Sequence, residues 1–402
     1  MLRLNEVEKK TFKYHLLFSL FNGILNGGLS LQEIILKKKF NSPNSIVTIA
    51  VMLWPLSNLF SIYWGYHLEN IEERKKLFYI AGIFGRLPLL LSIFINNGGQ
   101  LLPILFITYF FNAFIIPVQN TIFQRNYTNE RRNLLFGLSL SVYSIFTLIS
   151  STIIGKLLDM NDKFFGIIYG LCGFSGFISL LFLSRIEINE RKNNKKREFK
   201  LLQPVLNMIN EFKENNQFLQ FEIAFTIYGM GILLILAVIP QFLVNKIKMS
   251  YSEISFVRVF LLNIVFSIFM PLSGYLNRYV HPIKITGISY FFLFIFSTLL
   301  GLTPYQNIFS VKGMVIFSFI IYAIAMAGVE MTWYLGSIYF AKDKDAVVHQ
   351  SIHVSLTAVR GLLAPPLGLF IMSRFNDLSA FLTGSFFFLV SSIVMLLLLK
   401  KM

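Results

Sequence analysis

Charged side chains are rare inside the apolar stretches of this sequence, and the few that occur there are the residues whose types could do chemistry. Arg86 lies ten residues beyond Lys76, and Glu330 stands eighteen residues after Lys312. Arg360 is about as far from the nearest charged residues on either side. At about 1.5 Å per helical residue, these groups lie roughly 15 Å or more from the charged loops. An ionisable group at such depth in a membrane is costly, so these residues are candidates for function.

The carboxylate of Glu330 has two possible uses. In the middle of a membrane it can be neutral in one state and charged in another, so it could carry a coupling proton. It could equally contact a cationic group of a solute. We expect Arg258 or Arg360 to pair with it from a neighbouring segment. Arg86 and Arg360 indicate with the same weight that the solute has an anionic group.

Two histidines share a face with Arg360. His349, His353 and Arg360 follow one another at helical steps of four and seven residues. Two His four residues apart can bind a metal, but no third ligand lies on that face and the single Cys172 has no partner, so we expect no metal and no cofactor. Proton handling by His353 stays an alternative.

The composition requires elements that can hold these groups in a membrane. The chain has 402 residues, of which 55% are hydrophobic and only 14% charged, whereas a soluble domain has about 25% charged residues. We predict an all-α membrane protein with about twelve transmembrane helices, since each crossing needs about 20 apolar residues. The predicted spans are residues 14–36, 44–66, 77–96, 101–123, 133–157, 163–184, 218–244, 251–277, 283–303, 313–340, 346–373 and 378–399.

Lysine and arginine indicate the orientation of these spans. Twenty-four of the 36 basic residues fall in the termini and the even-numbered loops, and nine fall in the odd-numbered loops. Basic loops stay on the cytoplasmic side, so both termini are expected there. This bias explains the net charge of +16 without nucleic acid as a partner. Richness in Lys, Asn, Ile and Phe is typical of an AT-rich bacterial genome, which suggests a bacterial cytoplasmic membrane. We expect a monomer.

The longest polar stretch divides the chain into halves. Residues 185–217 form a basic linker between a six-span bundle over residues 1–184 and a second over residues 218–402. The linker could let two bundles rock, or it could be a passive tether. The second span of each half ends in a glycine followed by a short basic loop, at Gly65 and Gly274, so the halves are internal repeats.

The first of these loops resembles the major facilitator superfamily. That family carries a loop motif of Gly, a carboxylate and basic residues after its second span. In "GYHLENIEERKKLF", Gly65 matches the opening, Glu69 takes the carboxylate position and Arg74 the last basic position. Asn70, Glu72 and Glu73 depart from the motif. The resemblance implies that the loop helps to hold the outward-facing state; the alternative is a basic turn that only sets topology.

The resemblance further implies that spans one, four, seven and ten line a central cavity. Each of these spans carries a polar stripe that could face water or substrate, or could form interhelical hydrogen bonds. The stripes supply the remaining candidates for substrate binding or coupling: Asn22, Asn26, Asn112, Gln119, Asn120 and Trp333. The carboxylates of Glu33 and Glu222 lie closer to span ends and are expected to reach water.

The function that follows is secondary active transport of a small solute by alternating access, coupled to protons. The alternative is a non-transporting membrane sensor or interaction protein on the same scaffold. No Gly-Lys phosphate loop and no Gly-x-Ser-x-Gly elbow occurs in the sequence, so we expect neither an enzyme nor an ATP-driven pump. The substrate and the direction of transport, uptake or efflux, stay open.

Overall fold

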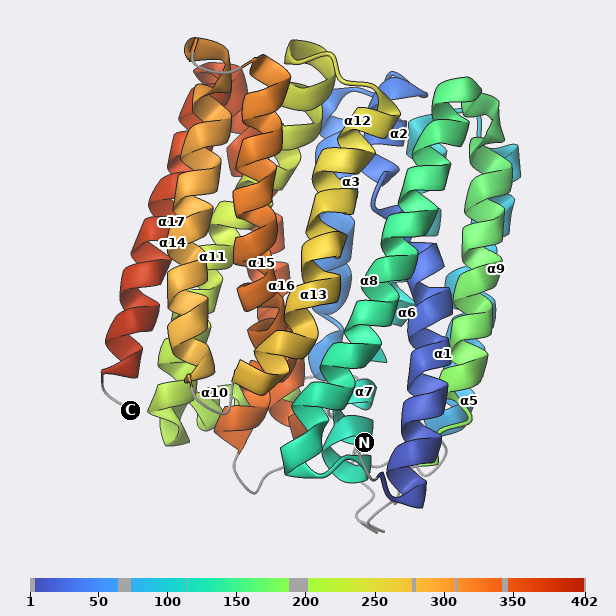
Figure 1. The fold of residues 1–402 in the computed structure, drawn as a ribbon, viewed down its shortest axis with the longest axis vertical. Helices are drawn as coiled ribbons and strands as arrows, with labels where there is room; N and C mark the ends of the chain where they lie inside the picture. The colour runs from blue at the N-terminus through green and yellow to red at the C-terminus, as the bar shows by residue number, and fades with distance from the viewer. Residues whose placement is uncertain are drawn as a thin grey trace.

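Long helices run side by side between two ends of the protein (Figure 1). The computed structural model describes residues 4–63, 74–113, 115–187, 202–276, 280–307, 310–341 and 346–400, and these contain helices but no strand. The two chain termini lie at the same end (Figure 1), which we call the terminal end. The opposite end is the distal end. This arrangement requires an even number of crossings, as the sequence predicted.

The described residues of the N-terminal half supply six crossings. They are α1 (Glu6–Leu29), α3 (Asn44–Asn58), α5 (Arg74–Ile80) continued by η1 (Ala81–Arg86) and η2 (Leu87–Phe94), α6 (Gly98–Asn112) with α7 (Ile115–Asn126), α8 (Asn129–Met160) and α9 (Phe165–Leu183). The short helix α2 (Gln32–Lys38) lies at the distal end.

The C-terminal half repeats the plan. Its crossings are α11 (Asn216–Gln241) with η4 (Phe242–Lys246), α12 (Tyr251–Ser255) with η5 (Phe256–Phe260) and α13 (Leu261–Leu276), α14 (Pro282–Leu302), α15 (Val311–Ala341), α16 (Ala346–Arg374) and α17 (Asp377–Leu399). Between the halves lies α10 (Gln203–Glu214), within the segment predicted to be a basic linker.

Ten helices in the described ranges are long and apolar enough to cross a membrane. The first and fourth crossings are less apolar or interrupted: α1 carries the polar stripe, and the fourth divides into α6 and α7.

The first helix also begins earlier than the predicted span of residues 14–36. The reason is a capping box, in which Asn5 Oδ1 accepts from the Glu8 amide at 2.8 Å and Glu8 Oε2 accepts from the Asn5 amide at 3.1 Å.

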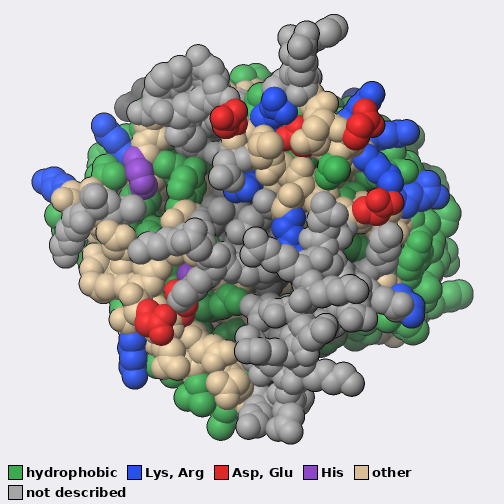
Figure 2. Space-filling model, turned by 90° about the horizontal axis from the view of Figure 1, so that it is seen from below, with side chains coloured by type: hydrophobic (Ala, Val, Ile, Leu, Met, Phe, Trp, Pro, Cys, Tyr) green, Lys and Arg blue, Asp and Glu red, His purple; other side chains and the backbone are tan. Residues whose placement is uncertain are grey.

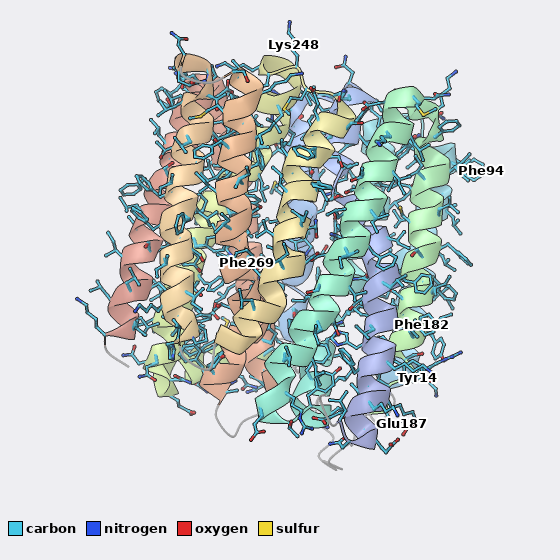
Figure 3. All side chains as sticks on the ribbon, viewed as in Figure 1. Tyr14, Phe94, Phe182, Glu187, Lys248 and Phe269 are labelled. Carbon is cyan, nitrogen blue, oxygen red and sulfur yellow. The ribbon has the colours of Figure 1, made fainter. Side chains whose placement is uncertain are left out.

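The outer surface fits a lipid environment. Large apolar side chains such as Phe94, Phe182 and Phe269 lie along the sides of the bundle, whereas Glu187 and Lys248 lie at its two ends (Figure 3). Phe94 is 75% exposed. Viewed from below, Lys, Arg, Asp and Glu side chains are scattered over the described part of the terminal end and around its rim (Figure 2). Charged ends and apolar sides are the pattern of a membrane-spanning bundle.

Glycines let the helices of the N-terminal half approach closely. A methyl group at Gly173 of α9 would lie 2.6 Å from Leu89 Cβ, and one at Gly166 would lie 2.7 Å from Ile93 Cα. Such contacts are too short, so only glycine fits. This glycine seam of α9 holds the third crossing, and with it Arg86, against the sixth.

The predicted conformational loop falls mostly outside the described residues. Gly65 and Glu69 lie in the range 64–73, about which nothing is described. Arg74 begins α5, and its side chain is likewise not described. Gly274 lies within α13. The role of this loop stays a prediction.

Candidate substrate cavity

A cavity of about 460 Å³ lies between the two halves. Its walls come from α1, α2, α3, η1, α6, α7 and α8 of the N-terminal half and from α11, η5, α13, α15 and α16 of the C-terminal half. The four spans that the resemblance named all contribute, and so do others. The volume is within the range of pockets that hold small molecules.

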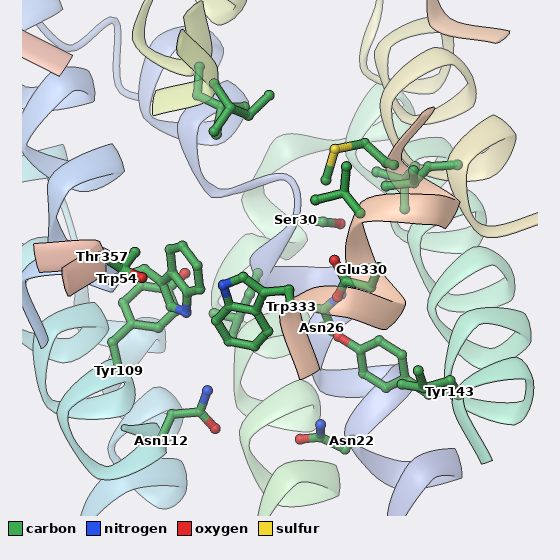
Figure 4. Close-up of a pocket in the computed structure, with 18 of the residues that line it drawn as sticks. Asn22, Asn26, Ser30, Trp54, Tyr109, Asn112, Tyr143, Glu330, Trp333 and Thr357 are labelled. Carbon is green, nitrogen blue, oxygen red and sulfur yellow. The ribbon is translucent and has the colours of Figure 1, made fainter. Parts of the chain in front are cut away.

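Most of the predicted site residues line this cavity. They are Asn22, Asn26, Arg86, Asn112, Gln119, Glu330, Trp333 and Arg360. His353 is not among the lining residues, and the side chain of Asn120 lies outside the described part of the structure. Figure 4 shows Glu330 beside Asn26 and Ser30, with Asn22 and Asn112 farther along the cavity.

Arg86 is held in the N-terminal wall. It ends the π-helical turn η1, a wide turn of the kind often found at functional sites. Its Nη2 donates to Asn112 Oδ1 at 2.8 Å, and its side chain is 3% exposed. A methyl group at Gly176 of α9 would lie 3.2 Å from Arg86 Cδ, so this glycine leaves the arginine its room.

Arg360 is fixed in the C-terminal wall. Its Nη1 donates to the carbonyl oxygen of Phe225 at 2.5 Å, and its Nη2 donates to Thr357 Oγ1 at 2.8 Å. A methyl group at Gly229 would overlap Arg360 Cδ. The glycine therefore allows the arginine to cross α11 and reach the carbonyl.

The expected pairing of Glu330 with an arginine is wrong. Arg258 Nη1 lies 3.4 Å from Glu33 Oε2, across the interface between the halves, and Arg360 is engaged as described above. Among the described residues, no side chain forms a hydrogen bond or ion pair with Glu330. Both Arg258 and Glu33 line the cavity.

Two tryptophans lie next to one another in the cavity wall. Trp54 of α3 and Trp333 of α15 have ring centroids 6.1 Å apart, at an interplanar angle of 37°. They come from different halves, and Figure 4 shows them adjacent, between Tyr109 on one side and Glu330 on the other. We call them the tryptophan pair.

Behind Trp333, two His–Glu pairs join α16 to α11 and to α10. His353 Nδ1 lies 2.8 Å from Glu222 Oε1, and His349 Nε2 lies 3.0 Å from Glu211 Oε1. Glu222 is 2% exposed, so the expectation that it reaches water was wrong. The imidazole of His353 lies against this carboxylate, and the rings of Phe221 and Phe225 pack against that imidazole. Glu222 Oε2 and His353 Nε2 are buried without a hydrogen-bond partner among the described residues.

At the distal end, polar contacts join the halves. Asp159, near the end of α8, accepts from the amides of Tyr251 at 3.0 Å and Ser252 at 2.9 Å, and from the Ser252 hydroxyl. Lys38 Nζ donates to the Met249 carbonyl at 3.4 Å and lies 4.3 Å from the centre of the Tyr251 ring. We call these residues the distal contact.

Comparison with known proteins decides the family. The sequence profile of the Major Facilitator Superfamily matches residues 15–348. The chain belongs to this superfamily.

Solved structures of superfamily transporters share the fold at low identity. The human organic anion transporter MFSD10 superposes with a TM-score of 0.70 at 12% identity, over 96% of this chain and 99% of that one. A POT family transporter in complex with a thioalcohol-conjugated peptide gives a TM-score of 0.77 at 11% identity, covering 97% and 96%. The nucleoside transporter NupG gives 0.64 at 14%, covering 96% and 99%. A search of curated protein sequences gave no match.

Membership of the superfamily establishes a multi-pass transporter scaffold for this chain, with about twelve helices in two bundles. Among the described residues, no group of three His, Cys, Asp or Glu side chains could hold a metal ion. The lining of the cavity offers charged groups, side-chain amides and aromatic rings.

Several site features of this superfamily member were not found by sequence reasoning. They are Asp159, Trp54, Tyr143, the Glu33–Arg258 pair and the Glu222–His353 pair. The only sequence signals for the ion pairs were isolated charges near span ends. Their partners lie 225 and 131 residues away along the chain, which no local pattern reveals.

Proposed function

We propose that this protein is a secondary active transporter that moves a small solute by alternating access, coupled to protons. The cavity between the halves is the observation that carries the proposal. A solute bound there touches both halves at once, so a relative movement of the halves changes the side from which it is reached. In this proposal residues 1–184 and 218–402 are the two moving bundles and residues 185–217 link them.

The distal contact supports alternating access. It joins the halves through hydrogen bonds and a cation–π contact at one end of the cavity, and such contacts can break without unfolding either half. At the other side, the Ile62 amide donates to Ser355 Oγ at 2.8 Å, which links α16 to residues just beyond α3. Opening one set of contacts at a time would expose the cavity to one side at a time.

The Glu222–His353 pair is the group that we assign to the coupling proton. A buried carboxylate and imidazole joined by one hydrogen bond can hold an added proton between them. Their second polar atoms have no described partner, so the site has spare capacity to donate or accept. His353 packs against Trp333 at 5.9 Å between ring centroids, so a change at the pair can reach the cavity wall. Glu330 remains free for the solute.

We further propose that the protein resides in a bacterial cytoplasmic membrane, as a monomer with both termini in the cytoplasm. The distribution of lysine and arginine supports this orientation, and the termini lie at one end (Figure 1). The structurally similar transporters are described as carrying organic anions, nucleosides or peptides, which shows how widely the solutes of this fold vary.

The test is transport by the purified protein in sealed proteoliposomes, with and without a pH gradient, for amino acids, dipeptides, nucleosides and organic acids. Accumulation or efflux that needs the gradient is the expected result. If a solute moved down its own gradient and a pH gradient had no effect, proton coupling would be contradicted, but transport would not. No movement of any solute class in either direction would favour the sensor function.

A further inference from the structure

The charges that line the cavity do not all compensate one another within the protein. The described lining residues include three arginines, Arg86, Arg258 and Arg360, and two carboxylates, Glu33 and Glu330. An unpaired charge in a site surrounded by membrane is costly, so each charge needs a partner from the protein, from water or from a ligand. Which charges lack a protein partner therefore indicates what a ligand must bring.

Three of these five charges have partners. Arg258 and Glu33 neutralise one another at 3.4 Å. Arg360 donates to a backbone carbonyl and to Thr357, and Glu222 of the same half lies within electrostatic reach of its guanidinium. These groups are parts of the wall and need nothing from a solute.

Arg86 and Glu330 remain. Arg86 uses one of its five donors on the neutral amide of Asn112, and no carboxylate pairs with it among the described residues. Glu330 is half-buried, faces the cavity (Figure 4) and has no described partner. One positive and one negative group thus stand in opposite halves of the same cavity. The hydroxyl of Tyr143 lies within electrostatic reach of both.

The tryptophan pair lies in the same cavity as these two charges. Its two rings, 6.1 Å apart between centroids, offer flat apolar surface from both halves. An apolar body can pack against either ring, and the cation–π attraction of indole also favours a cationic group near it. The positive group, the negative group and the apolar surface together indicate which chemical groups a matching solute must carry.

We propose that the solute is amphoteric: its anionic group binds Arg86, its cationic group binds Glu330, and its apolar body packs against Trp54 and Trp333. The proposal rests on the proposed transport function, because it names the solute class for the same cavity. Each end of such a solute supplies the charge that pairs with the unpaired group of one half. The solute therefore links the two halves only when both of its ends are bound.

Binding to the detergent-purified protein tests this class without transport. The probes are the twenty amino acids and a set of dipeptides, each in four forms: the zwitterion, the N-acetyl form with only the anion, the amide with only the cation, and the N-acetyl amide with neither. Isothermal titration gives the Kd, and quenching of tryptophan fluorescence reports occupation beside the tryptophan pair. We expect at least one zwitterion to bind, with a Kd at least tenfold lower than that of either singly charged form.

Variants assign the two poles. In Glu330→Gln, the zwitterion and its N-acetyl form should bind within about twofold of one another; in Arg86→Gln, the zwitterion and its amide should do so. Glu330→Asp keeps the charge and should keep the preference, which separates loss of charge from misfolding. Asp377→Asn removes a carboxylate that pairs with Lys246, away from the cavity, and should change nothing.

Two results would overturn the proposal. One is a singly charged form that binds as tightly as its zwitterion, or a panel in which no zwitterion binds. The other is a Glu330→Gln protein that still prefers the cationic group, which would assign Glu330 to another role such as proton transfer. Either result leaves the transport function standing if proteoliposomes move another solute, whereas zwitterion binding without any transport would contradict the proposed function alone.

Discussion

Asp159 Oδ1 lies 3.0 Å from the amide nitrogen of Tyr251 and accepts its hydrogen bond. The carboxylate belongs to the last turns of α8 in one half, and the amide begins the helical run of α12 to α13 in the other. A negative group at a helix N-terminus is favourable because the first amides have no partners within the helix. The distal end is therefore closed in part by the attraction between the carboxylate at the end of α8 and the free amides at the start of α12.

Replacing Asp159 by Asn should open the distal end more often. Both carboxylate oxygens accept hydrogen bonds, and an amide keeps only one acceptor, so we expect a loss of about 1 kcal/mol at this exposed site. The measurement is labelling of Ile239→Cys, a cavity position, by a membrane-impermeant maleimide, with the buried Cys172 replaced by Ala. Labelling should be about fivefold faster. Asp377→Asn is the control, and an unchanged rate in Asp159→Asn would remove this contact from the closing mechanism.

Glu222→Gln should uncouple transport from protons. The amide can keep a hydrogen bond to His353, but it cannot take up a proton. We expect accumulation driven by a pH gradient to fall at least tenfold, while exchange of solute across the membrane continues. Glu211→Gln is a matched control, because it changes the neighbouring His–Glu pair at His349. If the control loses coupling and Glu222→Gln keeps it, the proton site has been assigned to the wrong pair.

Gly361→Ala should weaken the packing of α16 against α3. The added methyl group would overlap the Pro55 ring, and a proline ring cannot rotate away. Overpacking of this kind costs about 1–3 kcal/mol, so the melting temperature in detergent should fall by several degrees. Gly99→Ala is the comparison, since its methyl group would meet only the Asn97 side chain at 3.3 Å. Equal melting temperatures for the two variants would contradict the close approach.

Glu8→Gln should destabilise the terminal end in a pH-dependent way. Although burial opposes its charged form, hydrogen bonds from the Asn5 and Thr128 amides and from Arg131 and the Thr128 hydroxyl lower the pKa of Glu8, which lies ahead of the membrane-crossing part of α1. A lowered pKa stabilises the fold above the ordinary value of about 4.3 and stops doing so as the pH falls through the folded value. The ion pair with Arg131 is 2.8 Å long.

The expected loss for Glu8→Gln is about 1–3 kcal/mol at pH 7. It should shrink as the pH falls through the lowered pKa of the folded state, where the native carboxylate also becomes protonated. Thermal unfolding over a pH series that runs from neutral to well below the ordinary value of about 4.3 measures it. Glu187→Gln removes the exposed ion pair with Lys10 and should cost little, because exposed pairs contribute little. A cost for Glu8→Gln that does not change with pH would point to packing rather than charge.

The sequence could predict how deep each charged residue lies in the membrane, but it could not predict which residues of other helices lie beside it. Counting residues from the nearest charges put Arg86, Glu330 and Arg360 far from both ends, and all three line the cavity. The same count put Glu222 near water, because it cannot represent His353, which comes from α16 and pairs with this carboxylate. The partner of Arg258 was missed because it depends on how the halves meet, and that register is set by packing over the whole interface.

Because Arg86 and Glu330 lie in different halves, the distance between the two charges of a solute should decide whether the solute is transported. Arg86 is fixed to the sixth crossing by the glycine seam, so the gap between the two charges changes only as the halves move. A solute whose charges are separated by the right length would let the cavity close around it. A longer one would hold the halves apart while still binding both poles, and would act as an inhibitor rather than as cargo. Homologous zwitterions that differ by single methylene groups would then divide into substrates and blockers at a sharp chain length.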